Sequence, residues 1–420
     1  MKKLLLATVA GPLFCAGLTF ATPNYVAHEW GTFTSVQGAD GVQLTWNPLS
    51  VSELPAFVYD WAKSEPPAQR NPRIVLVGKS TSMSLQRMET PVIYFYSDDE
   101  ITVNAKVDFP LGSMTEWYPK AQIPGSATGI GMGPRTLEWS GIKISPIPPP
   151  AKLSLPTLLQ ENSSSHYYAA RETDADIVRV NGETEKFLFY RGVGNFRAPL
   201  TVTQSGHSGE SIAVKNTGAE SLRQLFVYQR KGDLARYVFV PSLDPNGRLE
   251  LALDSSVPFA PSSEIRKKLG SELGSALTRE GLYEREAKAM VKTWDDSWFA
   301  EQGLRVFYAL PGAWTDRVLP LSLTPKPAEI IRVMVGRAEL ITPRMEDDLK
   351  REIVRYAHGT PEEKANAVNA ARALGLGRFM EPTIRRLTQR TPDQAFAAQS
   401  AELLNAAIKP EPPGKKLAAK

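Results

Sequence analysis

Two glutamates and a histidine are the side chains in this sequence with the clearest capacity for acid–base chemistry. Glu29 lies in the run His-Glu-Trp-Gly-Thr-Phe-Thr-Ser, and Glu116 precedes Trp117. Paired carboxylates beside aromatic side chains are the groups that glycoside hydrolases use, and a nearby histidine can carry a proton. Glu29, Glu116 and His166 are therefore the candidate catalytic residues of one hypothesis, a secreted hydrolase that acts on a carbohydrate or another envelope polymer.

The same regions are rich in side chains that bind ligands without reacting. Arginines and tyrosines such as those near His166 could clamp an anionic or sugar-like ligand. A structural role competes with this hypothesis, because arginines also form ion pairs between sheets, aromatic rings fill cores, and a histidine can be hydrogen-bonded within a buried strand. The candidate binding residues are His28, Trp30, Trp117, Tyr167, Arg171 and Arg191.

Three short segments resemble catalytic motifs, but each lacks an essential part. Residues 28–32 begin like the zinc-binding H-E-x-x-H motif, with Thr32 in place of the second histidine. Residues 206–210 lack the final glycine of a nucleophile elbow, and Ser140–Lys143 matches S-x-x-K within a strand-like run. No metal site and no cofactor is predicted. The favoured hypothesis is a non-catalytic binding or assembly protein of the cell envelope or extracellular space, with the hydrolase as the alternative.

The N-terminus has the pattern of an export signal. Two lysines precede the apolar run Leu4–Phe20, and cleavage is predicted after Ala21, which makes residues 1–21 a signal peptide. Cys15, the single cysteine, lies inside this segment, so the mature protein is predicted to have no disulfide and no thiolate nucleophile. No later run of about 18 apolar residues occurs, so no membrane span is expected after cleavage. We expect a periplasmic or extracellular protein.

Charge is spread evenly along most of the chain. The formal net charge is +4, and only residues 409–420 have a clear positive excess, which predicts a disordered basic tail. A nucleic-acid partner is not expected, because such proteins have a basic stripe or patch. The expected partner is an envelope protein or a polysaccharide.

Apolar spacing divides the mature chain into ranges of different structure. Ranges 22–143 and 157–257 contain short β-branched and aromatic runs, and residues 101–109 alternate most regularly. The proline-rich stretch 144–156 between them predicts a semi-rigid linker. Together these ranges predict an antiparallel β-sandwich-like structure for the N-terminal two-thirds.

The apolar period changes after residue 261. Ile265, Leu269, Leu273 and Leu277 recur every four residues, which predicts a helix. Range 262–343 is predicted to be mixed α/β with short strands, and range 344–408 to form helical hairpins, of which the last resembles a HEAT-type pair. The predicted fold class is therefore multidomain β + α.

Three runs carry a resemblance to a protein family. Residues 28–35 (HEWGTFTS), residues 88–96 (METPVIYFY) and residues 298–343 together resemble a family of exported bacterial proteins of unknown function. The resemblance covers most of the mature chain. It implies export and a shared fold, and it assigns no activity to any residue.

Overall fold

The computed structural model describes residues 24–49, 54–61, 83–125, 133–147, 155–156, 166–205, 211–253 and 257–408. The predicted signal peptide, a predicted strand at 73–77, most of the linker 144–156, the segment 206–210 and the basic tail lie outside the described residues. Among the described residues, no helix has the length and apolar character needed to cross a membrane.

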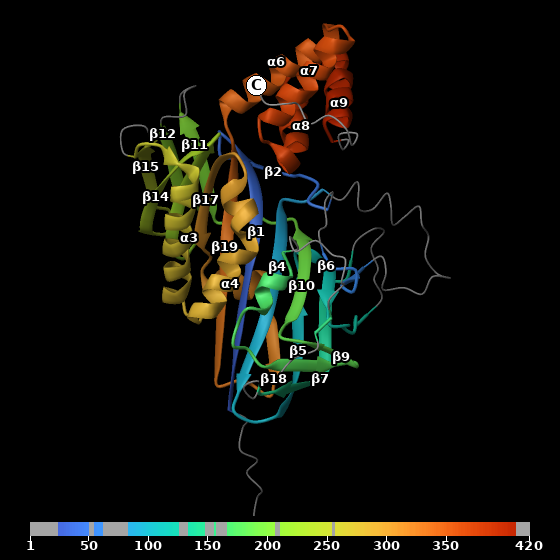
Figure 1. Ribbon diagram of the computed structural model, residues 1–420, viewed down its shortest axis with the longest axis vertical. Coiled ribbons are helices and arrows are strands. Elements are labelled where there is room, and N and C mark those ends of the chain that lie inside the picture. Colours follow the sequence, from blue (N-terminus) through green and yellow to red (C-terminus); the bar gives the residue numbers. More distant parts are fainter. Residues whose placement is uncertain are drawn as a thin grey trace, which may run out of the picture.

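A large mixed sheet forms the centre of the molecule (Figure 1). Its two central strands run parallel, and the other pairs run antiparallel. From the centre outward on one side, the strands are β1 (Tyr25–Gly38), β4 (Gln86–Ser97), β10 (Leu188–Gly194), β6 (Gly112–Tyr118) and β3 (Tyr59–Asp60), with β2 (Gln43–Leu44) also paired to β1. On the other side they are β19 (Glu329–Ile341), β17 (Gly303–Ala309), β13 (Leu222–Lys231), β14 (Leu234–Leu243) and β16 (Ala260–Pro261).

Two smaller sheets cover one face of the large sheet and enclose the first apolar core. Side chains of the large sheet such as Phe33 and Met334 are buried there with Val107 and Ile212 of the smaller sheets. This layered β structure confirms the predicted β-rich N-terminal two-thirds. One small sheet contains β11 (Leu200–Ser205), β12 (Ser211–Asn216) and β15 (Arg248–Ala252). The other contains β18 (Leu321–Thr324), β5 (Ile101–Asp108), β7 (Thr136–Ser145), β8 (Ile177–Val180) and β9 (Glu183–Glu185).

Strands from different predicted ranges share these sheets. Strand β10, from the second β-rich range, lies between β4 and β6 of the first. Strands β17 and β19, from the range 262–343, join the same sheet. The boundaries expected at 143 and 157 therefore do not separate independent sheets, because proline-rich composition marks where a chain bends and not which strand it later pairs with.

Two helices cover the opposite face of the large sheet (Figure 1). They are α3 (Ser262–Arg279) and α4 (Glu284–Asp295), and a π-helical turn, η3 (Asp296–Ala300), extends α4. The predicted stripe at Ile265, Leu269, Leu273 and Leu277 is buried in this second core, which confirms that helix. The short elements η2 (Tyr168–Arg171) and α5 (Gly312–Val318) complete this part of the chain.

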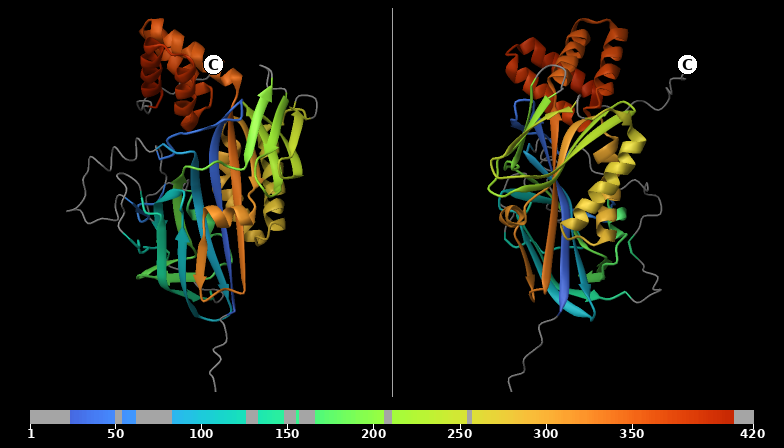
Figure 2. Two further views of the ribbon diagram at one scale, coloured as in Figure 1. Left: turned by 180° about the vertical axis from the view of Figure 1, so that it is seen from behind. Right: turned by 90° about the vertical axis from the view of Figure 1, so that its left-hand side faces the viewer.

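The remaining helices form a cap at one end of the large sheet (Figure 2). The cap contains α6 (Pro343–His358), α7 (Pro361–Ala373), η4 (Gly377–Phe379), α8 (Met380–Arg390) and α9 (Gln394–Ile408). It confirms the helical C-terminal range. A third apolar core joins the cap to the sheet, where Val36 and Trp46 pack with Leu349, Ile353 and Phe379.

Candidate functional site

His28 belongs to a buried hydrogen-bonded network under α4. Its Nδ1 lies 2.7 Å from Oε2 of Glu286, and the same carboxylate accepts from the Tyr96 hydroxyl at 2.7 Å and from the Tyr283 amide at 2.8 Å. His28 and Glu286 are 1% and 0% exposed, and Trp30 fills the neighbouring core at 0%. These contacts therefore support a structural role for His28, as a hydrogen-bonded histidine in a buried strand.

Glu29 points to the other face of β1 and is held in a buried ion pair. Arg332 Nε lies 2.6 Å from its Oε2, and the Tyr190 hydroxyl donates to Oε1. Burial and the adjacent Glu29 carboxylate raise the pKa of Tyr190 well above its usual value. Both carboxylate oxygens are thus occupied, and Glu29 is completely buried. This arrangement leaves Glu29 no access to a substrate.

Glu116 and Trp117 lie on β6, near one edge of the large sheet. Glu116 is 7% exposed and accepts a hydrogen bond of 2.5 Å from the Thr115 hydroxyl. Trp117 points into the first apolar core. Because Glu116 pairs across the strands with Arg191, it is a sheet neighbour of the site described below and shares no contact with Glu29.

Tyr167 and Arg171 enclose Glu185 instead of forming an open clamp. The Arg171 guanidinium donates to Glu185 through Nε (3.0 and 3.1 Å) and Nη2 (2.6 Å), and the Tyr167 hydroxyl donates at 2.9 Å. Glu185 is fully buried. Their contacts therefore support the ion-pair alternative.

His166 and Arg191 both line one pocket of about 240 Å³, which we call the arginine pocket. It lies where β4, β10, the end of α4, the π-helical turn and η4 of the cap come together. His166 Nε2 is 2.8 Å from Asp296 Oδ1, and its ring packs 4.8 Å from Trp294. The lining residues are Arg87, Glu89, His166, Arg191, Trp294, Ser297, Glu301 and Arg378.

An irregular stretch of β4 shapes this pocket. The pairing of β4 shifts register against both β1 and β10 at Thr90, and Thr90 has a φ of 50°. A positive φ is strained for a β-branched residue and tends to occur at functional sites. The Thr90 hydroxyl accepts from Arg191 Nη2 at 3.2 Å. The bulge therefore fixes Arg191, and the π-helical turn places Ser297 opposite, another irregularity common at functional sites.

Glu89 is the anchor of the pocket. Arg378 Nη1 lies 2.8 Å and Arg87 Nε 3.2 Å from its Oε1, and Thr34 donates to Oε2 at 2.7 Å. Burial alone would raise the pKa of Glu89, but Arg378 and Arg87 hold that pKa far below its usual value. Glu301, 2.5 Å from Arg337 Nη2, has a lowered pKa for the same reason.

The arginines of the pocket have more donors than the described residues supply acceptors. Nε of Arg191, and both Nε and Nη2 of Arg378, are buried without a hydrogen-bond partner in the described part of the chain; so is Nε1 of Trp294. Burial, followed by repulsion from Arg87, lowers the pKa of Arg191 to about 10, while Glu116 opposes this change. Arg191 is still a cation at neutral pH.

Sequence reasoning found two of the eight lining residues and missed most of the others. Trp294 packs against Trp298, with ring centroids 6.5 Å apart. Arg87, Glu89 and Arg378 carried no motif. The signal that could have indicated Arg87 and Glu89 is the polar Gln-Arg-Met-Glu-Thr-Pro stretch within an otherwise apolar strand.

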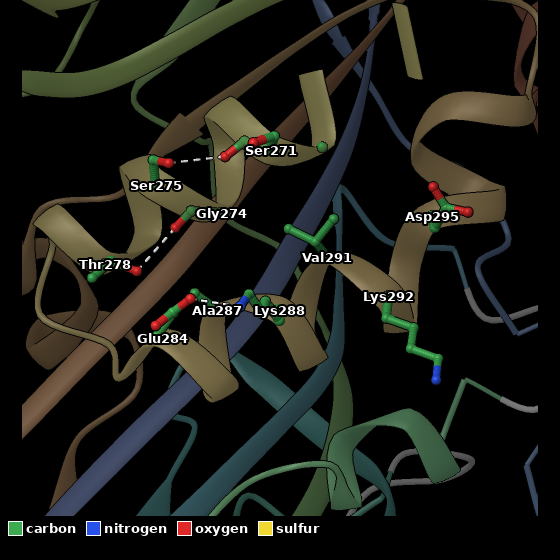
Figure 3. Close-up of a pocket in the computed structure, with 11 residues that line it drawn as sticks. Ser271, Gly274, Ser275, Thr278, Glu284, Ala287, Lys288, Val291, Lys292 and Asp295 are labelled. Carbon is green, nitrogen blue, oxygen red and sulfur yellow. Dashed lines mark hydrogen bonds and ion pairs between the residues drawn. The ribbon is translucent and has the colours of Figure 1, made fainter. Parts of the chain in front are cut away.

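A wider groove of about 770 Å³ runs between α3 and α4 (Figure 3). Small side chains of α3, such as Ser271 and Ser275, line it together with Glu284 and Lys288 of α4, while the Lys292 side chain points away from α3 and pairs with Glu172. No buried polar atom without a partner lies among its described lining residues. No group of three or more histidine, cysteine, aspartate or glutamate side chains that could hold a metal ion occurs among the residues that the structure describes.

Comparison with known proteins gives no family. No family model matches the sequence, and no curated protein matches it. Among solved structures, the Fcho1 mu homology domain of Danio rerio with a bound Eps15 peptide has a TM-score of 0.33 and 8% identity, over 76% of this chain and 98% of that chain. The yeast delta-COP-I mu-homology domain complexed with a Dsl1 WxWxV peptide has a TM-score of 0.27 and 8% identity, over 76% and 96%. These scores are too low to support an inference about function.

Proposed function

We propose that this chain is a non-catalytic binding protein whose ligand site is the arginine pocket. The observation that carries the proposal is the set of buried guanidinium donors on Arg191 and Arg378 that have no acceptor among the described residues. A buried N–H group without a partner costs about 1–3 kcal/mol, and more when it is charged. An oxyanion supplies the missing acceptors through charge-assisted hydrogen bonds. The ligand is therefore a small molecule, or an exposed end of a larger one, that carries an oxyanion.

The acid–base properties of the pocket favour binding over hydrolysis. A general acid works best when its pKa lies near the operating pH. Glu89 and Glu301 are held ionised by arginines, so neither has a proton to give at neutral pH. Glu29 and Glu116, the carboxylates of the hydrolase hypothesis, line none of the pockets described above.

Export remains part of the proposal. It rests on the apolar N-terminal segment and its flanking lysines. In a periplasmic or extracellular setting, the oxyanion would come from an acidic polysaccharide, an envelope protein or a free metabolite. Fractionation of producing cells, with and without residues 1–21, tests the location.

Calorimetric titration of the purified chain tests the binding site. We expect at least one of glucuronate, lactate and inorganic phosphate to bind with one-to-one stoichiometry. Arg191→Gln and Arg378→Gln should each weaken binding 10- to 100-fold, because each removes a charge-assisted hydrogen bond of about 1.5–3 kcal/mol. Arg351→Gln, in an exposed part of α6, is the matched control and should change nothing. The proposal fails if none of the three anions binds, or if both pocket variants bind as well as the control.

A further inference from the structure

We infer that the ligand of the arginine pocket is a hydroxylated monocarboxylate of about monosaccharide size, such as a sugar acid. This inference rests on the proposed function and narrows it to one chemical class. Three features carry it: the empty edge of Arg378, the charge balance of the pocket, and the polar groups that lie apart from the arginines.

The first feature is the geometry of the Arg378 donors. Nη1 donates to Glu89, whereas Nε and Nη2, which share the opposite edge of the guanidinium, have no acceptor among the described residues. Elsewhere in this molecule the same edge binds a carboxylate. Arg171 holds Glu185 this way, with Nε 3.0 Å from Oε1 and Nη2 2.6 Å from Oε2. Two parallel N–H groups match the two oxygens of a planar carboxylate.

The second feature is the net charge of the residues that line the pocket. Among the lining residues, the three arginines face the carboxylates of Glu89 and Glu301, while His166 is paired with Asp296. Behind this layer, Arg305 and Arg337 both pair with Glu339, and Arg337 also pairs with Glu301. The lining residues alone therefore contain one more arginine than glutamate, and a single carboxylate neutralises that excess. A phosphate monoester, with nearly two negative charges at pH 7, would place its second charge against the glutamates.

The third feature is a set of polar groups that can bind hydroxyls. Trp294 Nε1 is a buried donor with no partner in the part of the chain that the structure describes. The Ser297 hydroxyl is only weakly engaged, at 3.5 Å from the Trp294 carbonyl. The Glu301 side chain is 36% exposed and binds Arg337 through one oxygen, Oε2. The volume of about 240 Å³ lies below the roughly 300–1,000 Å³ of pockets for drug-sized ligands, which suits a six-carbon hydroxy acid better than a drug-sized ligand.

Calorimetric titration of the full chain with four matched compounds tests the inference. The compounds are D-glucuronate, D-glucose, D-glucose 6-phosphate and cyclohexanecarboxylate. We expect glucuronate to bind at least 10-fold more tightly than each of the others. Arg378→Lys, which keeps the charge and removes the two-donor edge, should weaken glucuronate binding at least 10-fold. Ser297→Ala should weaken glucuronate binding several-fold and leave cyclohexanecarboxylate binding unchanged. Circular dichroism and thermal unfolding show whether each variant is folded.

The outcomes separate this inference from the proposed function. Tighter binding of glucose 6-phosphate overturns the carboxylate class and leaves an oxyanion-binding pocket standing. Equal binding of glucuronate and cyclohexanecarboxylate overturns the role of the hydroxyl groups. If the Arg378→Lys variant is unfolded, the Ser297→Ala variant tests the inference instead. The inference is overturned if Ser297→Ala leaves the ratio of the glucuronate and cyclohexanecarboxylate affinities unchanged. Failure of all four compounds, together with lactate and inorganic phosphate, overturns the proposed function as well.

Discussion

At the scale of single residues, the Glu89 carboxylate compensates the charges of the arginines that line the arginine pocket. It is 2% exposed and forms ion pairs with arginines from β4 and from the cap. Removing one partner of a buried ion pair leaves the other charge uncompensated, which costs about 3–5 kcal/mol. Stability and charge compensation therefore depend on the same side chain.

We expect Glu89→Gln to lower the free energy of unfolding by about 3 kcal/mol at pH 7. The pKa of Glu89 is lower in the folded protein than in the unfolded chain. Its stabilising contribution is thus fully present above the unfolded value of about 4.3 and declines as the pH falls below it. The difference between wild type and variant should therefore shrink below about pH 4. Urea denaturation between pH 3 and pH 8 measures this. Glu362→Gln, at an exposed position of α7, serves as control, and a difference that does not depend on pH would contradict the assignment.

The residues of the candidate site were only partly predictable. His166 and Arg191 were named because they stand in clusters of polar and aromatic side chains. Glu89 and Arg378 are 289 residues apart, and a contact over such a distance leaves no periodicity or motif in a single sequence. Trp30, Trp117 and Tyr167 were named for their aromatic surfaces, and all three are buried in apolar cores. An aromatic ring has the same sequence signature in a core as in a binding site.

At the scale of elements, the bulge in β4 requires a glycine in the strand beside it. A Cβ at Gly31 would lie 2.9 Å from Pro91 Cα and 3.0 Å from Met334 Sδ. The two runs HEWGTFTS and METPVIYFY, which carried the family resemblance, are therefore in contact at this point. Alternating and four-residue periods predicted β5 and α3 well, because those patterns are local. The pairing of strands depends on residues far away in the chain and was not predictable.

Gly31→Ala and Gly274→Ala should change stability in opposite directions. At Gly31 the added methyl overpacks a rigid contact, which costs about 1–3 kcal/mol. Gly274 lies in the interior of α3 with nothing within 4 Å of an added Cβ, so alanine should stabilise the helix by up to about 1 kcal/mol. Thermal unfolding of both variants gives the comparison. A neutral Gly31→Ala would mean that β4 can shift away from β1 without cost.

At the scale of the whole molecule, the charged pocket lies between two of the three apolar cores. The pocket lies on the helix-covered face of the large sheet, between the core under α3 and α4 and the core that holds the cap. Arg378, in η4, is the lining residue that the cap contributes. The cap is therefore part of the site.

Trp46→Ala should loosen the cap selectively. Trp46 is fully buried, 5.4 Å from the Phe379 ring, and it belongs to the core under the cap. Replacing a buried tryptophan with alanine costs about 3–5 kcal/mol. Hydrogen exchange should become faster in α6 to α9 and stay unchanged in α3 and α4, which pack in a separate core. Val354→Ala, at a site on α6 that is 46% exposed, is the control. Equal acceleration in both sets of helices would show that the cores unfold as one unit.

The parallel pairing of β1 with β19 also sets the order in which the protein can fold. Glu29 and its partner Arg332 are 303 residues apart, so the central pair of the sheet closes a loop that contains most of the chain. Contacts between residues so distant in sequence form slowly. During synthesis, β1 is made first, whereas β19, its parallel partner at the centre of the sheet, is made only when the chain is almost complete. Strand β1 can pair with β4 much earlier, since those two strands lie close together in the sequence, so one edge of β1 is completed long before the other.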